Sequence, residues 1–224
     1  MSISSLRGHH FWTDHLDEQS VVIDAGAHQG EFSAELARRF GCRCHLIEAN
    51  PALAGKLVAP PNGSVTRGAL GPQDGRAAFQ LDANMEASRL STAGQGILAT
   101  VEVDVVSLPT LMTRTGATEL ALLKLDVEGA EFDILATTPV EVLRRIAQIT
   151  VEFHDFMPGF AGRGLFETAR ARLATCGFIC CPMSVRSHGD VFFLNRARVP
   201  LNAWQSGYVQ HLARYVSKAR GLCS

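Results

Sequence analysis

The residue types best suited to acid–base chemistry occur in two short segments of the sequence. Asp126 follows the apolar run LLKL, and Glu152 and His154 follow the apolar run ITV. Since parallel strands end at the same edge of a sheet, we expect these three side chains to lie close together. Histidine titrates near neutral pH, so we predict that His154 acts as a general base. Asp126 is the alternative base, and Glu152 is the third catalytic candidate.

The same three side chains also form a candidate metal site. Asp126, Glu152 and His154 would offer the mixed oxygen and nitrogen ligands that divalent ions accept, with Mg2+ as the expected ion. We favour the alternative without a metal, in which Glu152 orients His154 or pairs with Lys124. Hard oxygen sites usually contain more carboxylates than we expect to converge here. The sequence leaves both interpretations open.

A glycine-containing turn near the N-terminus is a second candidate site. In the segment VVIDAGAHQGEF, Asp24 ends an apolar run, and Gly26 and Gly30 line the turn that follows. Glycines lack a Cβ atom, so the backbone of such a turn can come close to a ligand. Glu48 ends the next apolar run, at about the spacing expected for a carboxylate that binds ribose hydroxyls. The pattern therefore predicts a nucleoside site.

Two kinds of nucleoside cofactor compete for this turn. A dinucleotide such as NAD requires the pattern G-x-G-x-x-G, but Ala27 and His28 follow Gly26, and the middle glycine is missing. Glu31 would place a negative charge where a pyrophosphate binds. S-adenosylmethionine has no phosphate and carries a positive sulfonium, which suits Asp24 and Glu31. The residues favour S-adenosylmethionine over NAD, and a purely structural turn is the remaining alternative.

These residues need a scaffold, and the sequence predicts a doubly wound α/β fold. Apolar runs alternate with amphipathic segments, which is typical of a parallel sheet covered by helices. Strands are expected at residues 20–24, 42–49, 64–70, 120–127, 146–155, 178–183 and 190–196. Helices are expected at residues 31–40, 50–58, 108–116, 129–138 and 164–177, and in a tail at 200–220. Strand-like segments at 71–82 and 99–108 are interpreted as an insertion that decorates the sheet.

Taken together, these segments resemble the FkbM-type methyltransferases. The resemblance covers roughly residues 20 to 156 and rests on VVIDAGAHQGEFS, HLIEANP, RGALGPQDGRAAFQL, VEVDVVSLPTLM, LLKLDVEGAEFDIL and ITVEFHD, in that order. It implies the class I methyltransferase fold, a Rossmann-like sheet of seven strands with the last strand antiparallel. It also implies methyl transfer from S-adenosylmethionine to an oxygen. His28 stands where we expect asparagine in this family, and its polar side chain can still bond locally.

The resemblance assigns a part of the cofactor to each matching residue. Gly26 and Gly30 would make room for the methionine part, and Glu48 would bind the ribose. The segment RGALG would flank the adenine. The full set of predicted cofactor-binding residues is Asp24, Gly26, His28, Gly30, Glu48, Ala49, Ala69, Leu70 and Asp126. The polar loop at 84–96, which contains Arg89, is predicted to cover the acceptor.

Composition narrows the choice of partners. The net charge is −1 and no basic stripe occurs, which disfavours nucleic acid, and no apolar run is long enough to cross a membrane. We expect a cytoplasmic protein whose acceptor is a hydroxyl of a small molecule such as a sugar or natural product. The alternatives are an NAD-binding oxidoreductase and a non-catalytic module that binds adenosylmethionine. Six cysteines without a C-x-x-C pair predict free thiols.

A single methyltransferase domain is expected over residues 1–224, with its core at about 18–197 and a C-terminal tail at 198–224. In the tail, Trp204, Tyr208 and Leu212 recur at helical spacing, which predicts a helix packed on the body of the protein. A homodimer contact through these residues is the alternative.

Overall fold

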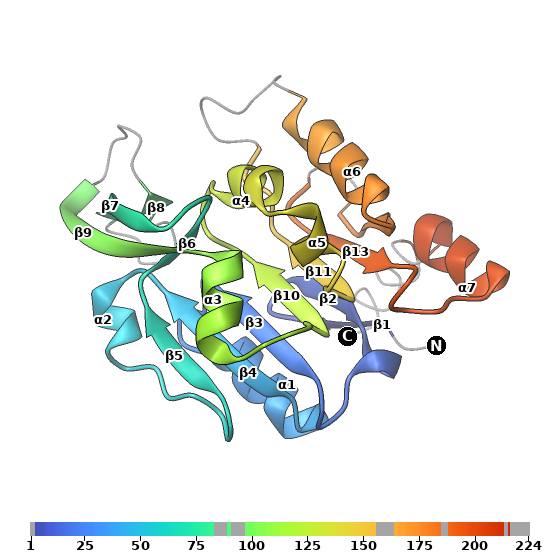
Figure 1. The fold of residues 1–224 in the computed structure, drawn as a ribbon, viewed down its shortest axis with the longest axis horizontal. Helices are drawn as coiled ribbons and strands as arrows, with labels where there is room; N and C mark the ends of the chain where they lie inside the picture. Colours follow the sequence, from blue (N-terminus) through green and yellow to red (C-terminus); the bar gives the residue numbers. More distant parts are fainter. Residues whose placement is uncertain are drawn as a thin grey trace.

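The computed structural model describes residues 3–82, 89–90, 97–155, 164–184, 188–212 and 215. Within these residues, seven strands form one sheet, here called the main sheet, in the order β12-β13-β11-β10-β3-β4-β5 (Figure 1). β13 runs antiparallel to both of its neighbours, β11 and β12, and the other neighbouring strands of this sheet pair in parallel. The strands are β3 (Val21–Ala25), β4 (Arg43–Glu48), β5 (Ser64–Arg67), β10 (Leu122–Leu125), β11 (Gln148–Val151), β12 (Phe178–Pro182) and β13 (Val191–Asn195). The predicted fold class is confirmed.

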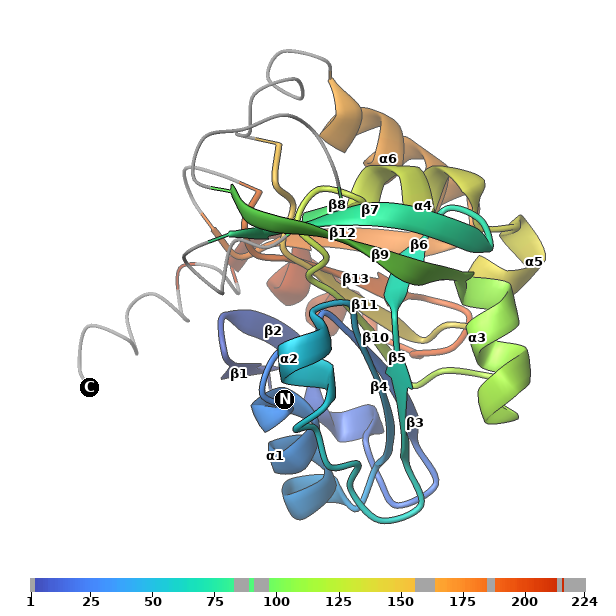
Figure 2. The same ribbon diagram turned by 90° about the vertical axis from the view of Figure 1, so that its left-hand side faces the viewer.

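Helices cover both faces of the main sheet because alternate strand residues point to opposite sides. Val21, Ile23 and Ala25 of β3 face one apolar core, whereas Val22 faces another. The first core is covered by α3 (Leu108–Thr115), α4 (Glu131–Thr137), α5 (Val140–Leu143) and α6 (Leu165–Thr175). Helix α1 (Glu31–Phe40) covers the second core, on the opposite side of the sheet (Figure 2).

The helix ends follow local sequence signals. Gly30 precedes α1 and Gly41 follows it, and both adopt left-handed backbone conformations. Helix α2 (Pro51–Ala54) begins as predicted, because the Asn50 side chain accepts a hydrogen bond from the backbone of Ala52. The prediction that this helix continues to residue 58 is wrong, since it ends before Gly55.

The strand predicted at residues 64–70 divides at Gly68. Its first half is β5 of the main sheet, and its second half is β6 (Ala69–Gly71) of a second sheet, ordered β6-β9-β7-β8 among the described residues. Gly68 has φ +151°, and a Cβ atom there would lie 2.6 Å from the carbonyl oxygen of Asp104. The other strands are β7 (Gly75–Asp82), β8 (Arg89–Leu90) and β9 (Ile97–Ser107). The predicted insertion is therefore a sheet of its own.

An N-terminal hairpin precedes the main sheet and was not expected from the sequence. It consists of β1 (Ile3–Leu6) and β2 (His9–Trp12), which pair antiparallel. Arg7 and Gly8 both have positive φ, as the favoured two-residue hairpin loops require. The side chain of Gln148 accepts a hydrogen bond from the Trp12 amide and donates one to its carbonyl, at 2.8 and 3.0 Å. This pair of bonds fastens the hairpin to β11.

The C-terminal tail packs differently from the prediction. Helix α7 (Ala203–Gly207) continues into a π-helical turn at Tyr208–Leu212, and Val209 is its buried residue. Trp204 is 63% exposed and stacks on Tyr208, so the prediction that Trp204 packs on the body is wrong. The side chain of Leu212 lies outside the described residues. No helix in the described part of the chain is long and apolar enough to span a bilayer.

The described cysteines are free thiols, namely Cys42, Cys44, Cys176, Cys180 and Cys181. Burial raises the pKa of Cys180 to about 12 and also raises the pKa of Cys44. Cys44 and Cys180 are therefore protonated at neutral pH and belong to the packing of the protein.

Candidate active site

The carboxyl ends of the central strands bring the predicted acidic residues to one edge of the main sheet. In the order of the sheet, Glu152 follows β11, Asp126 follows β10, Asp24 lies in β3 and Glu48 ends β4. A ligand bound at this edge would therefore cross from Glu48, past the glycine turn, to Asp126 and Glu152.

Gly26 allows the turn after β3 to contact the end of β10. Its φ is +75°, and a Cβ atom there would lie only 1.7 Å from the carbonyl oxygen of Asp126. The amides of Gly26 and Ala27 both donate to the carbonyl of Ile47 in β4. A glycine is thus required at position 26 because two backbone segments approach each other closely there, whether or not a ligand also binds. Gly30, with φ +77°, then begins α1.

Glu48 is buried beside the turn and oriented by two backbone amides. Its Oε2 accepts a hydrogen bond from the amide of His28, and its Oε1 accepts one from the amide of Asn50, both at 2.8 Å. His28 itself has a left-handed backbone, with φ +51°. Each carboxylate oxygen has a second lone pair, so Glu48 can still accept hydrogen bonds from a ligand.

Asp24 and Glu31 have partners other than the predicted ligand. Asp24 has no exposed surface, accepts a hydrogen bond from Ser33 Oγ at 2.7 Å, and lies 3.2 Å from Lys124 Nζ. Through these contacts Asp24 stabilises the glycine turn. Because its side chain is buried, Asp24 does not fit the predicted direct contact with a cofactor. Glu31 pairs with Arg7 of the hairpin at 3.0 Å, so its charge is not left for a cationic ligand.

Lys124 is a buried cation that holds the turn and the strand ends together. Its Nζ donates to the carbonyl of Gly26 at 2.8 Å and lies 3.5 Å from Asp126 Oδ2. Burial opposes the charge of Lys124, but Asp24 and Asp126 outweigh this effect and raise its pKa. Burial also opposes the charge of Asp126, but Lys124 and then His9 lower its pKa. Both groups are therefore ionised at neutral pH.

His154 lies between two carboxylates and is itself buried. Its Nδ1 is 2.9 Å from Glu131 Oε1, and its Nε2 is 3.2 Å from Glu128 Oε2. Burial opposes its charge, but Glu131 and Glu128 outweigh this effect and raise the pKa of His154 to about 9. His154 is thus cationic at neutral pH with both nitrogens engaged. This placement does not fit the general base predicted from the sequence.

Glu128 is the partly exposed member of this group, and the sequence analysis assigned it no role. Its backbone is left-handed, with φ +56°, and its side chain is 22% exposed. Burial, together with Asp126 and Glu131, raises the pKa of Glu128 to about 7, although His154 acts in the opposite direction. Glu131 is fully buried and accepts hydrogen bonds from the amides of Val127 and Gly129, which anchors the loop after β10.

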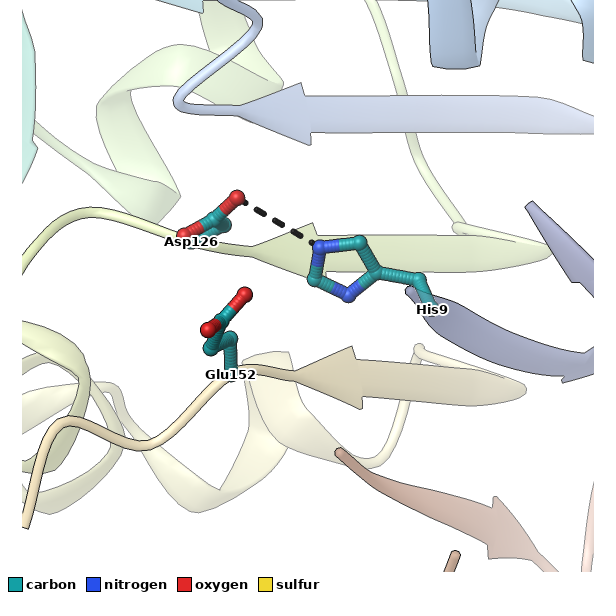
Figure 3. Close-up of side chains that lie close together, drawn as sticks. All are labelled: His9, Asp126 and Glu152. Atoms are coloured by element: carbon teal, nitrogen blue, oxygen red, sulfur yellow. Dashed lines mark hydrogen bonds and ion pairs between the residues drawn. The ribbon is translucent and has the colours of Figure 1, made fainter. Parts of the chain in front are cut away.

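The hairpin residue His9 was also missed by sequence reasoning. Its Nε2 lies 3.5 Å from Asp126 Oδ2, and Glu152 projects toward the same carboxylate from β11 (Figure 3). Its Nδ1 lies 3.4 Å from Thr150 Oγ1. Burial, followed by the charge of Asp126, raises the pKa of Glu152. The four residues of β2, HHFW, are buried, half-buried, buried and buried, so no regular alternation of polar and apolar residues marked this strand in the sequence.

The predicted metal ligands do not form one group. Among the described residues, two sets have ligand atoms within 4.8 Å of one another: His9 with Asp126 and Glu152, and Asp126 with Glu128 and His154. Asp126 therefore belongs to both sets, whereas Glu152 meets His9 and not His154. The ammonium of Lys124 already supplies positive charge beside Asp126, and we assign no ion to this edge.

The residues predicted to flank an adenine lie at the start of the second sheet. Leu70 is 1% exposed and packs in the main core, so its side chain does not fit the predicted contact. Ala69 is buried with Phe79, and Ala49 packs against the same small cluster. The predicted acceptor loop at 84–96 lies outside the described residues, apart from the backbone of β8.

The main sheet, with its antiparallel β13, its glycine turn after β3 and its acidic residue at the end of β4, has the arrangement of the class I methyltransferases. A family model described as the methyltransferase FkbM domain matches residues 24–180, which is most of the chain. The chain therefore belongs to the FkbM methyltransferase family. Its members are S-adenosylmethionine-dependent methyltransferases, and this chain is one of them.

The solved structures to which this chain is similar share little sequence with it. The fibrillarin pre-rRNA processing protein of Methanococcus jannaschii is 12% identical with a TM-score of 0.46, covering 86% of this chain and 69% of its own. A precorrin-6y C5,15-methyltransferase from Geobacter metallireducens is 15% identical with a TM-score of 0.42, covering 80% and 79%. An RNA methyltransferase from Salinibacter ruber, solved with S-adenosyl-L-homocysteine, is 13% identical with a TM-score of 0.35, covering 84% and 88%. No curated protein matches the chain.

Proposed function

We propose that this chain transfers the methyl group of S-adenosylmethionine to a hydroxyl oxygen of a small molecule such as a sugar or natural product. The observation that carries this proposal is the Glu128 carboxylate. It lies at the ligand-binding edge, beside Asp126, with its pKa raised to about 7. A carboxylate with such a pKa can accept the proton of a hydroxyl at physiological pH.

The donor set at this edge suits a cationic nucleoside that lacks phosphate. Glu48 offers carboxylate oxygens, whereas Lys124 is buried and already pairs with two aspartates. We propose that Glu48 holds the ribose hydroxyls, because its two oxygens are fixed by backbone amides next to the glycine turn. When bound, S-adenosylmethionine supplies an electrophilic methyl group on its sulfonium.

Glu128 is the proposed catalytic base, in place of His154. An aliphatic hydroxyl is a weak nucleophile until its proton has an acceptor, and the reacting oxygen must lie about 3 Å from the methyl carbon. With S-adenosylmethionine bound, Glu128 would accept the proton of the hydroxyl, and the cofactor would supply the methyl group and leave as S-adenosylhomocysteine. His154 is the positioning residue behind Glu128, and Glu131 fixes the orientation of its imidazole.

The cofactor part of the proposal is tested by calorimetry with S-adenosylhomocysteine and with NAD. We expect the wild-type protein to bind S-adenosylhomocysteine and not NAD. The variant Glu48→Ala should bind S-adenosylhomocysteine at least about tenfold more weakly, because the substitution removes the charged acceptors for two ribose hydroxyls. Unchanged affinity in this variant would reject the ribose role of Glu48, and preferential NAD binding would favour the oxidoreductase alternative.

The catalytic part is tested by transfer of labelled methyl from S-adenosylmethionine to a panel of monosaccharides and polyketide alcohols. With an accepted alcohol, Glu128→Gln should keep its affinity for S-adenosylhomocysteine and lose about a hundredfold or more in kcat. Glu141→Gln, which alters an exposed glutamate of α5, is the matched control and should retain full turnover. Full turnover by Glu128→Gln would remove Glu128 as the base. Cofactor binding without transfer to any alcohol would favour a non-catalytic module.

A further inference from the structure

The N-terminal hairpin lies outside the part of the chain that matches the family. The match begins at residue 24, whereas β1 and β2 end at Trp12. Strand β2 packs against β11 and β13 of the main sheet, and Gln148 fastens Trp12 from inside the protein. The hairpin therefore lies outside the matched segment, and it is attached beside the strands that carry the acidic site.

The pairing of β2 turns His9 toward the ligand-binding edge. His9 and Phe11 share the buried face of the strand, while His10 lies on the other face and pairs with Asp190. His9 is 1% exposed, packs edge-on against Phe32 of α1, and lies within hydrogen-bond distance of Asp126 and Thr150. With Nε2 protonated, His9 donates to the Asp126 carboxylate and accepts from the Thr150 hydroxyl.

The order of the strands places the contact between His9 and Asp126 at the end of the site where the acceptor alcohol is proposed to bind. Glu48 lies on β4, at one side of the glycine turn, and Asp126 and Glu152 lie on the opposite side, after β10 and β11. If the ribose of the ligand binds at Glu48, then the opposite end of the ligand reaches Asp126 and Glu152. Figure 3 shows His9 beside these two carboxylates, projecting toward them from the hairpin at the right of the view.

We propose that His9 is a positioning residue through which the N-terminal hairpin sets the geometry of the acceptor subsite. The inference rests on the proposed function, since it takes the edge near Asp126 as the place where the alcohol binds. By donating to Asp126, His9 fixes the carboxylate so that Asp126 and Glu152 present their oxygens to the acceptor's hydroxyl groups. Acceptor choice is then determined in part by a segment that precedes the part of the chain matched by the family model.

The test compares three variants of the full chain: His9→Ala, His9→Gln and His15→Ala. Gln can place an amide nitrogen near the position of the imidazole Nε2, so it is the conservative replacement. His15 is an exposed histidine in the short 3-10 turn after β2 and is the matched control. The measurements are the affinity for S-adenosylhomocysteine, the kcat and KM for an accepted alcohol, and the ¹³Cγ NMR titration of Asp126.

For His9→Ala we expect the KM for the alcohol to rise about tenfold, or kcat/KM to fall by the same factor. This is the loss expected when a hydrogen bond to a charged group is removed. The S-adenosylhomocysteine affinity should stay within about threefold, and the Asp126 titration should move to higher pH. His9→Gln should recover most of both effects, and His15→Ala should show neither.

Three results would overturn this inference. Wild-type kinetics in His9→Ala would show that the hairpin does not act on the acceptor, and a parallel loss of S-adenosylhomocysteine affinity would make His9 a cofactor contact. Turnover that is abolished by a chelator and restored by Mn2+ would make His9 a metal ligand instead. The NMR titration needs no alcohol, so an unmoved Asp126 signal refutes the contact even if no acceptor is found. A moved signal without transfer to any alcohol refutes the acceptor role together with the proposed function.

Discussion

His154 lies between the carboxylates of Glu128 and Glu131, and this placement determines the charges at the site. The pKa of His154 is raised to about 9, so the imidazolium persists at neutral pH. The pKa of Glu128 is raised to about 7, so about half of this carboxyl is ionised at neutral pH. The residue that titrates near physiological pH is thus the glutamate, and the histidine beside it is a fixed positive charge.

The raised pKa values of Glu128 and His154 predict how the rate of the reaction depends on pH. A base must be unprotonated, so kcat/KM should rise as the pH increases through about 7 and reach a plateau below about 9. In His154→Gln the cation that lowers the pKa of Glu128 is absent, so the rising limb should move to higher pH. The measurement is the pH–rate profile with a single alcohol, with His15→Gln as the control and circular dichroism to confirm folding. Loss of turnover at every pH in a folded His154→Gln would instead restore His154 as the base.

Residue types alone could not assign these roles. The sequence places Asp126, Glu152 and His154 at neighbouring strand ends, which is where they lie. It does not reveal that Glu128 turns back toward His154, because that depends on a left-handed backbone at a non-glycine residue. Nor does it reveal that Glu131, at the start of α4, reaches the same imidazole.

At the scale of elements, the glycine turn joins three strands at once. Its amides bond to β4, its carbonyl accepts from Lys124 in β10, and Gly26 touches the backbone of Asp126. The turn and the acidic loop after β10 therefore form one unit. A change in the turn will also displace the residues that carry the proposed chemistry.

Gly26→Ala should accordingly damage both stability and the site. The added Cβ would meet the Asp126 carbonyl at 1.7 Å in a left-handed backbone, so we expect a loss of about 3 kcal/mol or more in unfolding free energy. Gly116→Ala is the matched control, since Gly116 has φ +68° with open space around it, and should cost about 1 kcal/mol. Urea unfolding followed by circular dichroism measures both. Equal losses in the two variants would show that the contact with Asp126 is unimportant.

Most strands and helices could be predicted from apolar periodicity, because burial determines their pattern. Helix α1 occupies its predicted range, and β10 and β11 lie inside theirs. The division of the third strand at Gly68 could not be predicted, since residues on either side of it carry similar apolar patterns. It results from the backbone of β9 approaching Gly68, which is a contact between distant segments.

At the scale of the whole molecule, the two sheets differ in how many buried apolar side chains pack against them. The main sheet is enclosed between large cores on both faces. The second sheet is supported by the small cluster of Ala69, Phe79, Val103 and Val105, and of its described residues it contributes only Leu70 and Val106 to the first of these large cores. Regions with few buried apolar contacts open at lower free energy than the core.

Native-state hydrogen exchange should therefore separate the two sheets. Amides of β3, β10 and β11 should exchange only through global unfolding, whereas amides that pair β7 with β9 should open at a free energy at least about 2 kcal/mol lower. The amides of α1 provide an internal reference, because this helix is packed against the main sheet. Equal opening energies in both sheets would show that the second sheet unfolds together with the main one.

The position of β13 has a consequence for synthesis on the ribosome. Residues 191–195 are made after β12, yet they lie between β12 and β11. Until β13 has left the exit tunnel, β11 is therefore paired only with β10, and β12 lacks its partner in the main sheet. Until then the nascent chain carries an unpaired apolar edge at β11, which is the kind of surface that chaperones shield and that aggregates seed from. A premature stop anywhere before residue 191 would make that exposure permanent.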